Sequence, residues 1–252
     1  MSRPIRYRTD WRPMNRTGLI VTLAIAALVG IVFGIWPELD LKLAALFYDP
    51  GKSGFWRAPD PGYMRLRNAG IWLTTLVAAL PIVAIVLKLI RPRWPMLVPG
   101  RAIVLMLTTL ALGPGVLANV VLKEHWGRPR PIDVGEFKGG EHFRAWWDPR
   151  GDCPRNCSFI AGDATGAFWT LAPAVVAPPA ARMLAVGAAL AFGAGVGMLR
   201  MAAGAHFFSD VIFAGVFMFL LIWLSHGLIY RWRRTRITDE AVEDAIERRR
   251  GR

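Results

Sequence analysis

The strongest constraint on this chain is a series of six long segments that contain no Asp, Glu, Lys or Arg. A helix that crosses the hydrocarbon core of a bilayer needs about 20 mainly apolar residues, because each residue adds 1.5 Å along the helix axis. The sequence therefore predicts an all-α fold, a single domain over residues 1–252 built as a bundle of six transmembrane helices. The predicted spans are residues 19–36, 69–87, 102–122, 164–181, 183–199 and 211–230.

Composition narrows the class of protein further. Hydrophobic residues make up 54% of the chain and charged residues 19%, proportions that argue against a disordered chain or a soluble domain. Lys and Arg number 31 against 18 Asp and Glu, for a net charge of +13. This charge favours an anionic partner, and in so apolar a chain a lipid bilayer fits better than nucleic acid. We expect no nucleic-acid partner.

The basic residues are distributed unevenly, which predicts an orientation. They are concentrated before the first span, between the second and third, and after the sixth. Because basic residues stay on the cytoplasmic side, both termini are expected there, as a basic arm (1–18) and a tail (231–252). The first span could instead be a secretory signal, but residues 34–38 offer no small-x-small cleavage site. We expect this span to be retained.

Ionisable residues gather at the predicted outer ends of the spans. One set lies at the end of the third span and in the Pro-rich turn after it, another at the start of the fourth, and a third between the fifth and sixth. In a six-helix bundle these segments can share one pocket. The residues are Lys123, Arg128, Arg130, Asp163, Arg200, His206 and Asp210.

Such a set suits the binding and transfer of a phosphate group. Arg binds phosphate through paired hydrogen bonds and Lys as a point charge. His206 and Asp210 are four residues apart and share a helix face, so the carboxylate could accept the Nδ1 proton and leave Nε2 free to attack. Backbone N–H groups at Gly162 could bind a phosphate oxygen.

Two other interpretations use the same residues. A single Lys or Arg at a span end commonly extends to the interface without any further role. A metal site is the rival chemistry, with His206, Asp210 and the loop acids Glu124 or Asp133 as ligands. Three nearby cations oppose a divalent metal and favour an anion, so we expect no metal.

Three motifs occur in a fixed order along the second half of the chain. Six residues separate Lys123 from Arg130-Pro131, residues 158–163 read Ser-Phe-Ile-Ala-Gly-Asp, and Arg200 is followed by His206 and Asp210. This order resembles the signature of the type 2 phosphatidic acid phosphatase superfamily, which includes bacterial lipid phosphatases. The family's six-helix membrane bundle agrees with the predicted number of spans.

The resemblance implies a lipid phosphatase of the bacterial inner membrane, with a periplasmic site and no metal or cofactor. His206 would be the nucleophile and form a phosphohistidine, Asp210 would orient it, and water would then release phosphate. The phosphate would be bound by Lys123, Arg130 and Arg200, supported by Gly162 and Arg128.

The middle motif departs from the family pattern. Ala161 stands where a phosphate-binding Ser is usual, and Asp163 where the family's His acts as general acid. Nearby cations favour the ionised form of Asp163, which makes it a poor proton donor near neutrality. A weak acid suffices when the leaving group departs easily. This favours a polyprenyl diphosphate or a glycolipid phosphate such as lipid A over phosphatidic acid.

Two cysteines precede this motif. Together with Asp163, the run Cys157-Ser158-Phe159 resembles bacterial lipid A phosphatases. Cys153 and Cys157 could form a disulfide in an oxidising compartment or remain free thiols. Two further functions would use the same site: a phosphotransferase that passes the group to a second lipid, and a catalytically silent protein that binds lipid phosphates.

Overall fold

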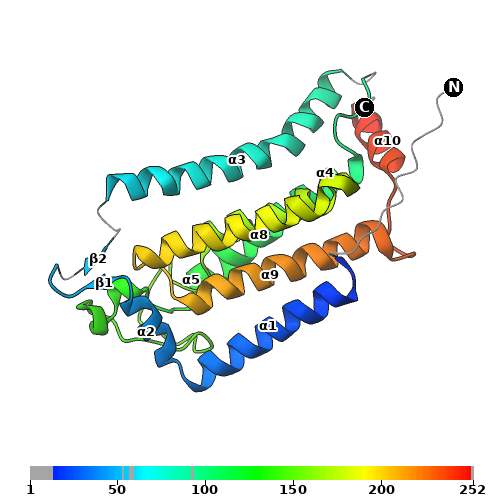
Figure 1. The fold of residues 1–252 in the computed structure, drawn as a ribbon. Helices are drawn as coiled ribbons and strands as arrows, with labels where there is room; N and C mark the ends of the chain where they lie inside the picture. The colour runs from blue at the N-terminus through cyan, green and yellow to red at the C-terminus, as the bar shows by residue number, and fades with distance from the viewer. Residues whose placement is uncertain (1–13, 53, 57–59, 92–93, 251–252) are drawn as a thin grey trace.

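The first apolar segment forms helix α1 (Arg16–Ile35), which begins where the Asn15 side chain accepts a hydrogen bond from the Gly18 N–H at 3.0 Å. The computed structural model describes residues 14–52, 54–56, 60–91 and 94–250. Most of the basic arm lies outside these residues. Figure 1 shows a bundle of long helices that run roughly alongside one another.

Five helical stretches are long and apolar enough to cross a membrane in the part of the chain that the structure describes. Two of them are composite, because an α-helix continues directly into wider π-helical turns. The five stretches are α1, α3 (Pro61–Ile90), α4 (Gly100–Leu110) with η2 (Ala111–Leu122) and α5 (Lys123–His125), α8 (Pro179–Ala202), and α9 (Phe208–His226) with η5 (Gly227–Arg231).

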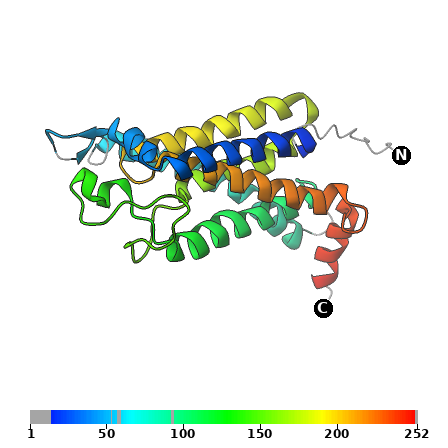
Figure 2. The same cartoon turned by 90° about the horizontal axis from the view of Figure 1, so that it is seen from below.

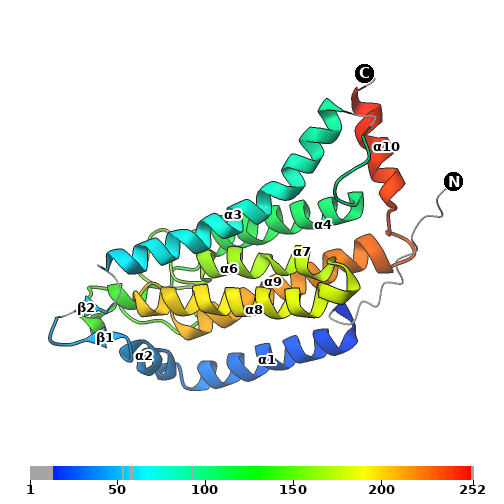
Figure 3. The same ribbon diagram turned by 45° about the horizontal axis from the view of Figure 1, so that its top comes forward.

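The predicted fourth span differs from expectation. It forms two short helices, α6 (Gly162–Trp169) and α7 (Leu171–Val175), so a count of six long spans is not reached. Proline explains the interruption, because Pro173 has no N–H to donate to the Trp169 carbonyl four residues earlier. Both α6 and α7 are mostly buried, and they lie inside the bundle between α4 and α8 (Figure 3).

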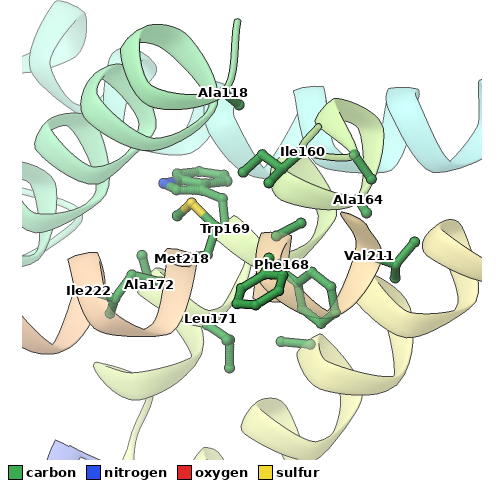
Figure 4. Packing of buried hydrophobic residues seen from close by; sticks show 14 of the residues in the cluster. Ala118, Ile160, Ala164, Phe168, Trp169, Leu171, Ala172, Val211, Met218 and Ile222 are labelled. Atoms are coloured by element: carbon green, nitrogen blue, oxygen red, sulfur yellow. The ribbon is translucent and has the colours of Figure 1, made fainter. Parts of the chain in front are cut away.

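Packing around the last residues of α6 holds this helix in place. Trp169 is fully buried, and its Nε1 donates to the Met106 carbonyl and to Thr109 Oγ1, both at 3.1 Å. Phe168 packs against Gly193 of α8, where an added Cβ would lie 2.2 Å from its ring. Figure 4 shows these aromatic side chains among apolar residues of α9, such as Met218. The C-terminal end of α6 is therefore anchored to the rest of the bundle.

The two ends of the bundle carry different structures. One, here called the loop end, holds α2 (Glu38–Ala45), the strands β1 (Tyr48–Asp49) and β2 (Gly54–Phe55), and two short turns at 131–133 and 135–137. At the other, the α10 end, α1 begins and α10 (Asp239–Arg250) follows η5 (Figures 1 and 2). Lys88 of α3 pairs with Glu243 of α10, and with Glu247 at 2.8 Å.

Candidate active site

Three cations surround a histidine at the loop end of the bundle. Lys123 ends the third helical stretch, Arg130 follows it in the Pro-rich turn, and Arg200 lies in the last turn of α8. We call these three residues the cation cradle. All three act electrostatically on the His206 imidazole, which is only 2% exposed. The structure thus brings together the three cations and the histidine that the sequence analysis placed in one pocket.

His206 is held in one tautomer. Its Nδ1 lies 2.8 Å from the Ser158 carbonyl oxygen, which can only accept, so Nδ1 carries the proton. Nε2 then bears the lone pair, and within the described chain it has no hydrogen-bond partner. Burial, chiefly, and then the cation cradle lower the pKa of His206 well below its usual 6.5. The imidazole is therefore neutral near pH 7 and chemically suited to attack an electrophile.

Asp210 contacts His206 differently from the expectation. Its Oδ2 is 3.9 Å from Nδ1, too far for the expected hydrogen bond. That oxygen instead accepts from Ser158 Oγ at 2.5 Å and from the Phe207 N–H at 2.8 Å, while Oδ1 accepts from Arg128. Asp210 therefore positions Ser158 by accepting a hydrogen bond from its hydroxyl group. The Ser158 carbonyl in turn orients the His206 imidazole by accepting from Nδ1.

Arg128 is placed behind the site and not within reach of a substrate. Its side chain is fully buried, and its nitrogens donate to Asp40 Oδ2 at 2.8 Å, to Ser209 Oγ at 2.9 Å, to the Arg144 carbonyl at 3.0 Å and to Asp210. With every nitrogen engaged, Arg128 is a structural cation. Arg128 therefore supports Asp210 from behind the site, and it does not line the space beside the cation cradle.

Asp40 completes this buried network and was missed by the sequence analysis. It is 1% exposed on α2, and besides Arg128 it accepts from the Ser209 N–H at 3.0 Å and from Ser209 Oγ at 2.5 Å. One signal was available: Asp40 and Ala44 are one turn apart on the buried face of α2, where an acid requires a partner.

Asp163 faces two arginines, one of which the sequence analysis also missed. Its Oδ2 accepts from Arg67 Nε of α3 at 2.8 Å and lies 3.3 Å from Arg200 Nε. Arg200 also donates to the Tyr63 hydroxyl at 3.1 Å. Arg67 precedes the charge-free segment that predicted the second span, which starts at residue 69. Helix α3 itself begins eight residues before that segment, at Pro61. A span defined by its apolar residues alone excludes this first, site-facing part of the helix.

Gly162 allows Lys123 to approach the start of α6. A Cβ at Gly162 would lie 2.6 Å from Lys123 Nζ, so any side chain there would displace the ammonium group. Gly162 also begins α6, whose first N–H groups point out of the helix. The ammonium group and free backbone donors are thus adjacent, as a phosphate oxygen requires.

The cysteine loop positions the remaining cation. Cys153 and Cys157 form a disulfide, which settles the alternative that the sequence left open. Asn156, inside this loop, has a left-handed φ of 53°, and its carbonyl accepts from Arg130 Nη2 at 2.7 Å and Nε at 3.1 Å. The loop thereby holds one edge of the Arg130 guanidinium.

Comparison with known proteins identifies the family. Residues 101–236 match the PAP2 superfamily. The chain is similar to a protein of Francisella tularensis subsp. novicida named lipid A 4'-phosphatase, with 33% identity over 223 residues, which cover 86% of this chain and 98% of that protein. A lipid A 4'-phosphatase of Rhizobium leguminosarum is 39% identical over 124 residues, 49% of this chain and 50% of that protein. No solved structure matches the chain.

The comparisons and the geometry agree on one type of protein. The matched region contains the cation cradle, His206 and Asp210, and the similarity to the Francisella protein extends over nearly the full length of both chains. The apolar helices place the protein in a membrane. The chain belongs to the PAP2 superfamily, as a membrane lipid phosphatase of that type.

Proposed function

We propose that the protein removes the 4'-phosphate from a lipid A-type glycolipid through a phosphohistidine on His206, without a metal ion. The observation that carries this proposal is the neutral imidazole whose Nε2 has no partner within the described chain, beside three cations. Similarity to lipid A 4'-phosphatases supports the choice of substrate.

In the proposed first step, Nε2 of His206 attacks the phosphorus atom and the bond from phosphorus to the sugar oxygen breaks. The cation cradle binds the non-bridging oxygens and stabilises the charge that develops on them. The Ser158 carbonyl holds the Nδ1 proton, so the imidazole that becomes positively charged keeps its orientation. Water then attacks the phosphohistidine, which releases inorganic phosphate and restores the neutral imidazole.

Asp163 serves, in this proposal, as a positioning residue. It accepts from Arg67 and faces Arg200, an arrangement that uses the carboxylate as an acceptor and holds Arg200 beside the phosphate. The proton for the departing sugar oxygen is then supplied by water. The Asp163 side chain is 22% exposed, so water reaches this part of the site.

The residue at position 163 and the similarity to known phosphatases favour different leaving groups. Asp163 in place of a histidine favours an easily departing group, such as the anomeric oxygen of lipid A or the phosphate of a polyprenyl diphosphate. The similarity to a 4'-phosphatase favours the 4' oxygen, and we give it more weight because it covers 86% of this chain and 98% of that protein, whereas the first observation concerns one residue.

We further propose that the site faces the periplasm, at the loop end. Arginines of α10 and of the segment between α9 and α10 lie at the opposite end, as expected for the cytoplasmic side. The disulfide at the loop end suits an oxidising compartment. Both termini would then be cytoplasmic.

The test is phosphate release by the purified protein from four lipids: lipid A lacking the 1-phosphate, lipid A lacking the 4'-phosphate, a polyprenyl diphosphate and phosphatidic acid. We expect the first to react fastest. Faster turnover of any other lipid would contradict the proposed substrate. Transfer of the phosphate to a second lipid instead of water would identify a phosphotransferase.

A further inference from the structure

Two cavities lie in series between α3, the α6–α7 segment and α8. The first, of about 160 Å³, is lined by Gly162, Asp163 and Gly166 of α6 and by Gly70 and Thr74 of α3. The second, of about 380 Å³, is lined further along the same elements, by residues such as Val77, Pro173, Ala188 and Phe192. On the α6–α7 segment and on α8 the lining residues of the second cavity lie farther from the loop end, and on α3 the two linings overlap around Leu73 and Thr74.

Apart from the Asp163 carboxylate in the first cavity, the walls of the two cavities are apolar, even at positions where the sequence has Thr. Thr74 Oγ1 and Thr75 Oγ1 donate to the carbonyls of Gly70 and Ile71 in their own helix, at 3.1 and 2.9 Å, so their hydroxyl groups are satisfied without a ligand. Small residues line α7 and α8, among them Ala174, Ala185 and Ala189. The second cavity therefore suits hydrocarbon and offers it no polar group that would need hydration, whereas the first cavity also contains the Asp163 carboxylate beside the cation cradle.

The lining of α3 extends from Gly70 to Leu80, about 15 Å along the helix axis. This is about half the thickness of a hydrocarbon core, or one leaflet. Leu73 and Leu80 on the rim are 48% and 57% exposed, so the second cavity is open sideways to lipid. Figure 1 shows that α3 and α8 run roughly alongside each other.

We propose that these two cavities form one groove that holds an acyl chain of the substrate while its phosphate lies at the cation cradle. The inference rests on the proposed function, because the occupant is the lipid that the site dephosphorylates. Continuity with the site carries it: Gly162 and Asp163 line the first cavity and also contact Lys123 and Arg200. Within the groove α3 comes near α8 at Gly70, where a Cβ would lie 3.3 Å from Val196.

A bulky residue in the groove tests this inference. Ala188→Trp on α8 fills the second cavity, and the matched control Ala194→Trp places the same side chain on the exposed opposite face of that helix. Each variant is assayed with the acylated lipid phosphate that the wild type turns over fastest, and with the corresponding phosphate that carries no acyl chain. Val77→Phe, on the opposite wall, repeats the test if Ala188→Trp fails to fold.

For Ala188→Trp we expect KM for the acylated substrate to rise about tenfold, the effect of excluding roughly two methylene groups, with kcat/KM for the acyl-free substrate unchanged. Ala194→Trp should match the wild type on both. Equal losses on both substrates, or no loss on either, would overturn the groove. Wild-type turnover decides the proposed function separately, since the groove predicts only the difference between substrates.

A second measurement does not depend on turnover. Lipid A with a photoreactive diazirine in one acyl chain is irradiated with the full-length protein, and the labelled peptides are identified by mass spectrometry. We expect label on residues that line the groove, such as Leu73, Val77, Ala185, Ala188 and Phe192, reduced by excess lipid A and not by phosphatidylethanolamine. Label confined to Leu184 and Ala194, on the exposed face of α8, would overturn the inference. Equal competition by phosphatidylethanolamine would show that bulk lipid fills the groove, with the same consequence.

Discussion

Asp40 and Arg128 form an ion pair in which Nη2 donates to Oδ2 at 2.8 Å and neither side chain is more than 1% exposed. The pair links α2, which lies outside the matched family region, to the network that orients His206. Through Arg128 and Asp210, α2 becomes part of the support of His206, the proposed nucleophile.

Asp40→Asn should therefore destabilise the protein. The substitution leaves Arg128 buried with one carboxylate fewer, and breaking a buried pair costs about 3 kcal/mol. We expect the free energy of unfolding in detergent to fall by about that amount, together with phosphatase activity. Glu38→Gln removes an exposed acid from the same helix and is the control. Equal stability of the two variants would exclude a supporting role for Asp40.

Arg67 provides a second prediction, for substrate binding. Arg67→Gln removes a positive charge beside the cation cradle and frees Asp163 to pair with Arg200 alone. We expect KM for the lipid phosphate to rise about tenfold at low salt, the effect of one charge-assisted hydrogen bond. Arg65→Gln, two residues earlier and exposed, should leave KM unchanged. A change in thermal stability without a change in KM would assign Arg67 to structure only.

The sequence predicted that the residues of the cation cradle lie together, because they lie close to the ends of the predicted spans. Lys123, Arg200 and His206 could be placed at one depth from hydropathy alone. The buried contacts that support these residues could not be predicted from hydropathy. Arg128 and Arg130 are alternate residues of one turn, and only the fold decides that the first is buried against Asp40 while the second faces the histidine.

For the helices too, hydropathy predicts the long spans, whereas the form of the fourth segment depends on contacts made in the fold. Five stretches carry enough apolar residues in a row to specify a span, and the structure contains them with shifted ends. The Ala-rich fourth segment has enough apolar residues but also Pro173 and Pro178, whose effect on helix length depends on neighbours that replace the lost hydrogen bonds. Here the outcome is two short helices enclosed by longer ones.

The pH dependence of catalysis should report the charge around His206. The pKa of His206 is lowered by burial and by the cradle, and the protonated form cannot attack. In the wild type, kcat/KM should therefore stay high below pH 6.5 and fall only as the pH passes through the lowered pKa. Arg130→Gln removes one positive charge, which raises that pKa, so the acid limb should move to higher pH.

The comparison of the two profiles uses one substrate, so ionisation of the phosphate affects both in the same way. An acid limb at the same pH in wild type and Arg130→Gln would show that another group limits the rate. A shift to lower pH would contradict the electrostatic account directly.

Opening the disulfide should weaken phosphate binding without disrupting the bundle. The Asn156 carbonyl, inside the loop closed by Cys153 and Cys157, holds the Arg130 guanidinium. We expect the double variant Cys153→Ser with Cys157→Ser to show a several-fold higher KM and a nearly unchanged kcat. Treatment of the wild type with a reductant is the matched experiment, and the double variant should not respond to it. An unchanged KM would show that Arg130 is held by other contacts.

The most direct test of the account is to locate the phosphate during turnover. The protein is mixed with a lipid phosphate labelled with ³²P, quenched in alkali, in which phosphohistidine survives, and analysed by peptide mass spectrometry. We predict label on His206 in the wild type, and neither label nor phosphate release in His206→Ala. Label on another residue, or release that persists at the wild-type rate in His206→Ala, would contradict the assignment of His206 as the nucleophile.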